Sequence, residues 1–181
     1  MLRGELYLAS DPDLVAARVR ARRLWADLNR SDPADGVLRA KMMRELLGGV
    51  GSNAWIEPPF YCDYGSNIFL GDGVFVNFGG VFLDPARIVI GAQAQLGPMV
   101  QLLTADHPRE AAARAAGPEL ARPITIGSRA WLGGGVVVCP GVTIGDGTIV
   151  GAGSVVVRDL PAGVIAAGNP CRVIRRIEAK A

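Results

Sequence analysis

The sequence predicts a mainly β protein in which a parallel β-helix of hexapeptide repeats follows a short helical segment. Hydrophobic residues recur every six positions through much of the chain, the first fifty residues show helical spacing, and one polar stretch interrupts the repeat without changing its phase. A period of six is typical of a solenoid rather than of an α-helix or an alternating strand. We therefore expect a helical segment over 1–50, a β-helix over 51–170 with a protruding loop at 103–123, and a basic tail over 171–181.

The first fifty residues contain two stretches with helix signals. Asp11 is a suitable N-cap and Pro12 a suitable first residue for a helix that continues through 14–28, where the apolar side chains fall largely on one face. A second helix is expected over roughly 33–47. We expect it to stop at Gly48–Gly49, because glycine accepts the left-handed conformation that closes many helices.

The repeat is most regular in the second half of the chain, where glycine follows four of its six apolar positions. These positions are Ile126, Leu132, Val138, Ile144, Val150 and Val156. An earlier group, Ile90, Leu96 and Leu102, keeps the same phase, whereas Leu70, Val76 and Phe82 are shifted by two. That shift predicts a small insertion at 84–86. Each aliphatic side chain should point into a central column, and each glycine should permit the following turn. Burial of one such side chain contributes about 1.5–3 kcal/mol, so the column should dominate stability.

The repeat disappears between Leu102 and Ile124 and resumes in the same phase, so the intervening polar stretch leaves the solenoid and returns to the next position on it. Loops of this length are usually functional. The chain's one histidine, His107, lies at the start of this loop in "TADHP". A lone histidine is often structural, but imidazole is the natural general base near neutral pH and a rigid coil can hold it against a partner surface. We therefore regard His107 as a candidate catalytic base.

The composition excludes several classes of protein. A net charge of +2 without a basic stripe argues against binding to nucleic acid, and there is no run of about 18 apolar residues to span a membrane. The N-terminus is interrupted by charges and lacks the apolar stretch of a signal peptide. The scattered Cys62, Cys139 and Cys171 indicate neither a disulfide framework nor a zinc site. We expect a cytoplasmic protein that requires no metal.

Five motifs occur together along the chain, and they are "GELYLASDPDL", "WIEPPFYCDYGSNIFLGDGVFVNF", "TADHP", "PITIGSRAWLGGGVVVCPGVTIGDGTIVGAGSVVVRDLP" and "GNPCRVIR". In this combination the chain resembles the maltose and galactoside O-acetyltransferases of the hexapeptide acyltransferase superfamily over nearly its whole length. Hexapeptides alone are shared by many acyltransferases, so the motifs at the solenoid entrance and in the loop are the more specific ones. The resemblance implies a left-handed β-helix and a homotrimer with active sites between subunits.

The resemblance also implies the reaction, which is transfer of an acetyl group from acetyl-CoA to a sugar hydroxyl. His107 would take the proton of the acceptor hydroxyl, whose oxygen would then attack the thioester directly. The family's acceptor-side positions correspond to Asn77, Asp63, Phe75, Glu119 and Trp131 in this chain. Glu119 could instead be a solvated carboxylate in the loop, and Trp131 could instead serve only in packing.

The donor side follows from the same resemblance. A backbone N–H near Gly134 matches the family's oxyanion contact, and Ala152 and Gly153 lie where small residues let the pantetheine arm run along the coils. Arginines at positions that surround CoA in the family have the geometry that suits phosphate. These arginines are Arg158, Arg172 and Arg175, and for Arg175 an ordinary solubilising role remains equally open. Acetyl-CoA is thus the expected cosubstrate.

The acceptor is the least defined part of this interpretation. At the position of Leu8, family members often carry an acidic residue that can help hold the acceptor.

Hexapeptide solenoids also serve other functions. A gamma-type carbonic anhydrase needs three histidines around its metal, and the single histidine of this chain excludes it. The alternatives that remain are a virginiamycin-type xenobiotic acetyltransferase, a serine O-acetyltransferase and a non-enzymatic trimeric scaffold. The expected partners are a small hydroxyl acceptor, a sugar by resemblance, and further copies of the chain, with no nucleic acid and no membrane.

Overall fold

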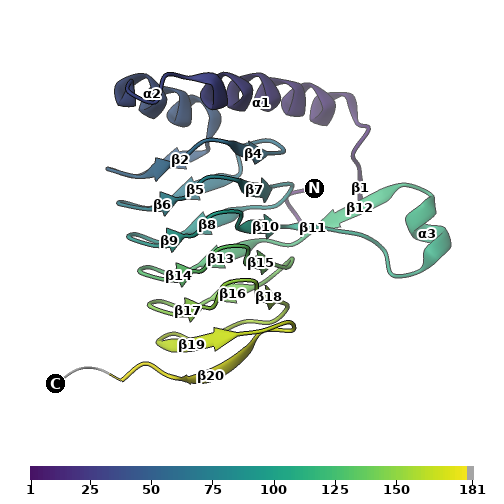
Figure 1. Ribbon diagram of the computed structural model, residues 1–181. Coiled ribbons are helices and arrows are strands. Elements are labelled where there is room, and N and C mark those ends of the chain that lie inside the picture. The colour runs from purple at the N-terminus through teal and green to yellow at the C-terminus, as the bar shows by residue number, and fades with distance from the viewer. Residues whose placement is uncertain (179–181) are drawn as a thin grey trace.

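The computed structural model describes residues 1–178 and shows a solenoid of three parallel faces with two helices at one end (Figure 1). Sheet 1 contains β2 (Gly49–Val50), β5 (Ile68–Leu70), β8 (Ile88–Ile90), β13 (Ile124–Ile126) and β16 (Thr143–Ile144). Sheet 2 contains β3 (Trp55–Ile56), β6 (Phe75–Val76), β9 (Gln95–Leu96), β14 (Trp131–Leu132), β17 (Ile149–Val150), β19 (Val164–Ala167) and the antiparallel β20 (Arg172–Arg176). Sheet 3 contains β4 (Phe60–Cys62), β7 (Gly80–Leu83), β10 (Gln101–Leu103), β15 (Val137–Val138) and β18 (Val155–Val156). The predicted β-helix of hexapeptide repeats is confirmed.

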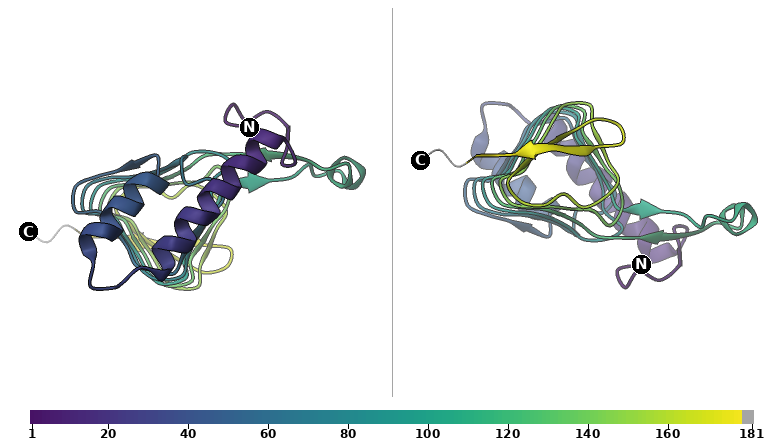
Figure 2. Two further views of the ribbon diagram at one scale, coloured as in Figure 1. Left: turned by 90° about the horizontal axis from the view of Figure 1, so that it is seen from above. Right: turned by 90° about the horizontal axis from the view of Figure 1, so that it is seen from below.

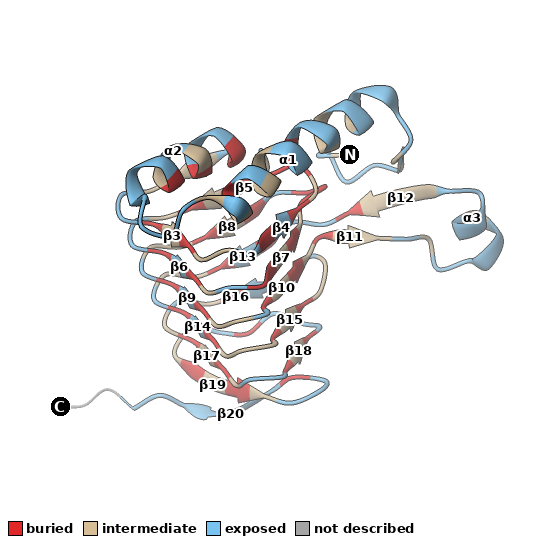
Figure 3. Cartoon of the chain, turned by 45° about the horizontal axis from the view of Figure 1, so that its top comes forward, coloured by how far each residue is buried: buried red, intermediate tan, exposed pale blue. Residues whose placement is uncertain are grey.

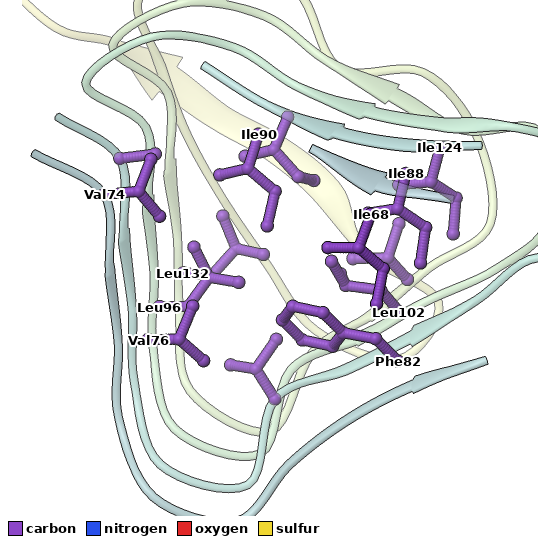
Figure 4. Packing of buried hydrophobic residues seen from close by; sticks show 14 of the residues in the cluster. Ile68, Val74, Val76, Phe82, Ile88, Ile90, Leu96, Leu102, Ile124 and Leu132 are labelled. Atoms are coloured by element: carbon purple, nitrogen blue, oxygen red, sulfur yellow. The ribbon is translucent and has the colours of Figure 1, made fainter. Parts of the chain in front are cut away.

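The chain visits sheets 1, 2 and 3 in turn, so that each coil has a triangular outline when seen along the axis (Figure 2). Side chains from all three faces meet inside this triangle (Figure 4). The positions predicted from the six-residue period, from Ile126 to Val156, are each at most 1% exposed. The small or aliphatic residues two places earlier in each repeat are buried as well. One apolar column therefore runs the length of the solenoid.

The predicted phase shift corresponds to two extra residues at one corner of the early coils. Leu70 pairs with Ile90, twenty residues later, whereas Ile126 pairs with Ile144, eighteen residues later. The additional residues lie in the turn from sheet 3 to sheet 1, because Phe82 and the inward Ile90 are eight apart. The insertion expected at 84–86 is confirmed.

The glycines that follow the apolar positions have a different role from the one predicted. Gly127 and Gly133 do not have a positive φ, so they do not provide the turn conformation. A Cβ added at Gly127 would lie 2.5 Å from the backbone nitrogen of Asp146 in the next coil, and one at Gly133 would lie 2.6 Å from that of Ala152. These positions need glycine because successive coils approach each other too closely for a side chain.

Two helices close the first end of the solenoid. Helix α1 (Pro12–Arg30) begins as predicted, with the Asp11 side chain accepting a hydrogen bond from the Asp13 N–H. Helix α2 (Gly36–Leu46) ends where expected, but the prediction of a left-handed glycine cap was wrong. Leu47 is extended at φ −93°, and neither Gly48 nor Gly49 has a positive φ. Gly48 instead passes so close to the Ser66 carbonyl that a Cβ would not fit.

The helical pair is held on the solenoid by apolar packing and by one amide side chain. Residues Ala21, Leu28, Met43 and Leu46 are at most 1% exposed and belong to the same core as the coils. The Asn29 side chain accepts from the Phe60 N–H at 2.8 Å and donates to the Phe60 carbonyl at 2.9 Å. Both backbone groups of this β4 residue are therefore paired with α1.

The other end of the solenoid is covered by β20, which pairs antiparallel with β19. The segment expected as a basic tail thus begins with a strand, whose five residues are all exposed. Residues 179–181 of that segment lie outside the described residues. No helix among residues 1–178 combines the length and the apolar character needed to cross a membrane.

The predicted loop forms an arm that projects from the solenoid (Figure 1). It consists of β11 (Ala105–Asp106), the short helix α3 (Ala111–Ala115) and β12 (Pro118–Ala121). Strand β12 lies between β11 and the N-terminal β1 (Tyr7–Leu8), and both pairings are antiparallel. The arm is therefore a small sheet that joins the N-terminus of the chain to its middle.

We predict that Gly127→Ala destabilises the protein by about 1–3 kcal/mol, because a Cβ would force two coils apart. Chemical denaturation at a fixed protein concentration measures this loss. Gly36→Ala is the matched control, since its Cβ would meet only the Trp55 ring at 3.8 Å and alanine favours helix. Equal stability of the two variants would contradict the close-approach explanation.

Candidate active site

All the extra residues of the solenoid are collected at the corner between sheets 3 and 1, which we call the insertion corner. Three successive coils leave their regular course there, at 63–67, at 84–87 and at the arm. The remaining coils turn this corner without added residues, as the spacing of Val138 and Ile144 shows. Polar segments from three coils therefore lie one above another at one edge of a rigid scaffold.

A pocket of about 320 Å³ lies at the insertion corner. Its walls come from β1, α1, the three added segments and β12, and they consist of Tyr7, Ala9, Arg18, Arg22, Asp63, Tyr64, Leu83, Pro85, Ala105, His107 and Glu119. His107 directly follows β11 and is exposed, as is most of the arm around it (Figure 3). The structure thus brings His107 together with two of the predicted acceptor residues, Asp63 and Glu119.

Hydrogen bonds fix several of the polar walls of this pocket. The Tyr7 hydroxyl donates to Glu119 Oε2 at 2.9 Å across the β1–β12 pair. Arg18 donates through Nη1 to the Tyr64 hydroxyl at 2.7 Å and through Nη2 to the Ala9 carbonyl. Partial burial raises the pKa of Tyr7 well above its usual value, and the contact with Glu119 raises it further. Tyr7 therefore stays protonated and remains a hydrogen-bond donor.

Opposing effects act on the pKa of the Asp63 carboxyl in this pocket. Burial raises the pKa of its carboxyl, and the nearby guanidinium groups of Arg18 and Arg22 partly offset that effect. Glu119 acts in the same direction as burial, because it is a second carboxylate in the same pocket. The pocket therefore holds hydrogen-bond donors and hydrogen-bond acceptors close together. Such a pocket suits a ligand with several hydroxyl groups.

A buried carboxylate supports the segment that carries Asp63. Asp84 is 0% exposed, and its Oδ1 accepts from the N–H groups of Asp63 at 3.1 Å and Tyr64 at 2.8 Å. The Asn67 side chain donates to the Asp84 carbonyl at 2.6 Å. Burial raises the pKa of Asp84 to about 6, although the backbone N–H groups act in the opposite direction. Asp84 thus holds the 63–67 turn by direct bonds to its backbone.

Sequence reasoning identified 84–86 as an insertion but missed Asp84 as the residue that organises the turn before it. It also missed Tyr7, Tyr64, Arg18 and Arg22. No local signal reveals these residues, because each meets the pocket through a contact with a distant part of the chain, as Tyr7 meets Glu119. Leu8 does not line the His107 pocket. It lines a neighbouring pocket of about 550 Å³ on the N-terminal side, which shares Tyr7 with the His107 pocket and also contains Asp11 and Asp13.

The remaining predicted residues lie away from His107 within one chain. Asn77, Gly134, Ala152 and Gly153 lie in turns between sheets 2 and 3, at the opposite edge of sheet 3 from the insertion corner. These turns stack on one another, with the Gly153 N–H donating to the Gly134 carbonyl at 2.9 Å. Gly134, Ala152 and Gly153 leave the later turns without large side chains, whereas the earlier turns expose Phe78 and Met99.

Three other predicted residues lie in one ladder on the outer face of sheet 2. The pairing register joins Phe75, Gln95, Trp131, Ile149, Ile165 and Arg175 in that order. Trp131 is 52% exposed and lines a pocket of about 780 Å³ along this face. That pocket has no residue in common with the His107 pocket. Arg158 and Arg172 are exposed near the same end of the solenoid as Arg175.

The backbone near Gly134 has a feature that bears on its predicted role. The N–H groups of Gly133 and Gly135 donate to the carbonyls of Val150 and Pro98, each at 2.8 Å. Among the hydrogen bonds within residues 1–178, none uses the Gly134 N–H, and the same holds for Ala92, Asp146 and Ala152 at the matching position of other coils. The half-buried Gly134 therefore has a donor that no other described residue uses. Within the same residues, no group of three or more His, Cys, Asp or Glu side chains is arranged to hold a metal ion.

Two family models match separate parts of the chain. The maltose acetyltransferase hexapeptide capping motif matches residues 1–51, and the bacterial transferase hexapeptide repeat matches residues 123–158. Among curated proteins, a putative acetyltransferase of Saccharomyces cerevisiae is 49% identical over 98% of this chain and 91% of its own length. The galactoside O-acetyltransferase of Escherichia coli is 41% identical over 96% of this chain and 86% of its own length.

Solved structures give the same result. A maltose O-acetyltransferase from Clostridium difficile has a TM-score of 0.97 and 43% identity, covering 98% of this chain and 95% of that one. A galactoside acetyltransferase in complex with coenzyme A has a TM-score of 0.95 and 41% identity, covering 98% of this chain and 89% of that one. The chain is thus similar to these proteins over its helices, its coils and its arm.

We predict that Asp84 makes stability depend on pH in a defined direction. Its pKa is about 6 in the folded protein against a usual value of 3.8, so folding favours the protonated form. The stabilisation is fully present below pH 3.8 and is lost as the pH rises through 6, amounting to about 3 kcal/mol for a shift of about two units. Unfolding free energies between pH 4 and pH 7 measure this slope.

Asp84→Asn provides the comparison, because asparagine keeps the shape but does not titrate. We expect the fall in stability between pH 4 and pH 7 to be smaller in this variant than in the wild type. The same slope in both proteins would show that Asp84 does not titrate in this range.

Proposed function

The chain belongs to the family of maltose and galactoside O-acetyltransferases, and from this premise we propose that it transfers the acetyl group of acetyl-CoA to a hydroxyl group of a sugar, with His107 as the general base. The observation that carries the proposal is the position of His107 in the wall of a pocket rich in carboxylate, hydroxyl and guanidinium groups. A sugar presents several hydroxyl groups, and such a pocket can pair with them.

In the proposed reaction the His107 imidazole removes the proton of the acceptor hydroxyl. The oxygen attacks the thioester carbonyl carbon as that proton leaves, and a C–O bond forms. The tetrahedral intermediate then collapses with cleavage of the C–S bond, and the leaving thiolate takes up the proton held by the imidazolium. The products are the acetyl ester and free CoA.

The negative charge on the thioester oxygen needs a hydrogen-bond donor in that intermediate. The Gly134 N–H, which is free in this chain, is suited to that role. The adjoining Ala152 and Gly153 leave the edge of the solenoid open for a narrow chain such as pantetheine. Arg158, Arg172 and Arg175 at the end of the solenoid would bind the phosphates of CoA. Acetyl-CoA would therefore lie along the coils as a cosubstrate.

Asp63 and Glu119 are proposed to accept hydrogen bonds from the acceptor. Glu119 Oε2 is already paired with Tyr7, which leaves Oε1 for the ligand. Asn77, Phe75 and Trp131 would complete the acceptor side from a different surface. These residues cannot do so within one chain, because they lie beyond the opposite edge of sheet 3.

This division leads us to propose a homotrimer in which each site uses His107 of one subunit and Asn77 of its neighbour. On sheets 2 and 3 and in the segments that flank sheet 3, the solenoid exposes large apolar side chains, and these are Tyr61, Phe75, Phe78, Met99, Trp131 and Val157. Packing of these side chains around a three-fold axis would remove them from water. It would also bring together the two halves of the site, since each pocket contains only one of them.

We predict that His107→Ala lowers turnover by about 10²–10⁴-fold, the usual contribution of a positioned general base. Release of CoA from acetyl-CoA measures it, against a panel of glucosides, galactosides, maltose, serine and a hydroxylated antibiotic. The thermal midpoint should not change, because no hydrogen bond among the described residues uses the His107 ring. If CoA release depends on His107 but occurs only with serine or only with the antibiotic, that compound class replaces the sugar as the proposed acceptor. Full activity of the His107→Ala variant would contradict the mechanism.

We predict that chains with His107→Ala and chains with Asn77→Ala restore activity when they are coexpressed. Random mixing in a trimer pairs an intact His107 with an intact neighbouring Asn77 in about a quarter of the sites. Each variant alone should be weakly active. Coexpression of His107→Ala with His107→Gln is the control and should give no recovery.

Static light scattering of the wild type at micromolar concentration provides an independent measurement. A mass of three chains is expected. A monomer, or the absence of any recovery on coexpression, would contradict a site shared between subunits.

A further inference from the structure

Asp106, the residue before the candidate base, is the centre of a cluster of hydrogen bonds at the root of the arm. Its Oδ1 accepts from the His107 backbone N–H at 2.9 Å. Its Oδ2 accepts from Arg122 Nη2 at 2.9 Å and from Arg109 Nη2 at 3.0 Å. The Asp106 side chain is only 12% exposed, although both arginines reach solvent. One carboxylate therefore joins the backbone of His107 to two guanidinium groups.

Arg122 connects this cluster to the solenoid. Its N–H donates to the Thr104 carbonyl at 2.9 Å, which closes the arm where it leaves and re-enters the coil. Thr104 is 0% exposed, and its hydroxyl donates to the Leu83 carbonyl at 2.9 Å in the coil above. Arg122 also packs on the turn at Gly141, whose added Cβ would lie 3.3 Å from the Arg122 Cβ. Asp106 is thus tied to the rigid part of the molecule through Arg122.

The arm has no apolar core that could hold His107, and its other restraints are the pairings of β12 with β11 and β1. Helix α3 has no buried residue, and from Ala105 to Leu120 no residue of the arm is buried. A segment without an apolar core opens readily unless polar contacts restrain it. Charge-assisted hydrogen bonds to a carboxylate that is largely shielded from water are stronger than exposed pairs.

We propose that Asp106 is a positioning residue for His107, and that its carboxylate, held by Arg122, sets where the imidazole lies in the pocket. Asp106 does not contact the substrate in this proposal. It fixes the His107 backbone through Oδ1, and the arginines fix the carboxylate through Oδ2. The inference rests on the proposed role of His107, because position matters for the rate only if this ring reacts. A displacement of about 1 Å can lower turnover by as much as 10²-fold.

The single histidine allows a direct measurement of this effect. In a ¹H–¹³C spectrum of protein labelled at histidine, the Cε1–H group of the ring gives one signal, which is assigned to His107 because the chain has one histidine. We expect Asp106→Asn to move or broaden this signal by more than a linewidth, and Arg122→Gln to do the same. Arg109→Ala should have a smaller effect, because that side chain is 82% exposed. Asp27→Asn removes an equivalent i,i+3 pair with Arg30 on α1 and should leave the signal unchanged.

Steady-state kinetics provide the second readout. We expect Asp106→Asn to lower kcat by about 10–100-fold while the KM for acetyl-CoA changes by less than about two-fold, since the hydrogen bonds of the Asp106 side chain involve none of the residues assigned to acetyl-CoA. The double variant Asp106→Asn/Arg122→Gln should have the same kcat as Asp106→Asn alone, because both substitutions remove the same Asp106–Arg122 interaction. A thermal midpoint close to that of the wild type would separate this effect from unfolding.

The two readouts keep this inference distinct from the proposed function. A shifted ring signal with unchanged kcat would mean that Asp106 positions His107 but that this ring is not the base, which overturns the catalytic part. An unchanged signal and an unchanged kcat in Asp106→Asn would overturn the positioning role itself. A loss of kcat equal to the loss of folded protein would also overturn it.

Discussion

The close stacking of successive coils is the constraint on which the rest of the structure depends. Coils approach so tightly that a Cβ at Gly127 would lie 2.5 Å from the next backbone, and inward side chains must recur every six residues. An added residue within a strand would turn the following side chains to the wrong face. Extra residues can therefore leave the solenoid only at a corner and must return in phase. In this chain they all do so at one corner, between sheets 3 and 1.

That constraint explains where the candidate site is found. Three consecutive coils supply the 63–67 turn, the 84–87 turn and the arm, so Asp63, Asp84 and His107 are stacked although they are far apart in sequence. The corner between sheets 2 and 3 has no insertion, and its turns are short. Gly134, Ala152 and Gly153 lie in its later turns, whereas its earlier turns expose Phe78 and Met99. One solenoid thus carries a polar pocket on one edge and short turns on another. A reaction that uses both requires two copies of the chain.

The sequence predicted those features that depend on periodicity. The apolar column, the two-residue insertion, the arm and the Asp11 cap all follow from local spacing, and the structure confirms them. It was wrong about Gly48 and about the repeat glycines, because close approach between coils cannot be read from a single repeat. It missed Asp84, Arg18 and the Tyr7–Glu119 pair, since these contacts join residues that only the folded coils bring together. Position within the fold, rather than residue type, gives these residues their roles.

The arm shows how a weakly packed segment can carry a precisely placed group. It has almost no apolar core, so its order depends on β1 pairing along one edge of β12 and on polar ties at its root. The Tyr7–Glu119 bond fixes the pocket wall, and the Asp106 carboxylate fixes the point where the chain leaves the coil. The Asp106 contact leads through Arg122 to Thr104, in a coil that the apolar column holds rigid, whereas the Tyr7–Glu119 bond joins two strands of the arm's own sheet. The stability of the column is therefore what permits an exposed arm to present His107 in one position.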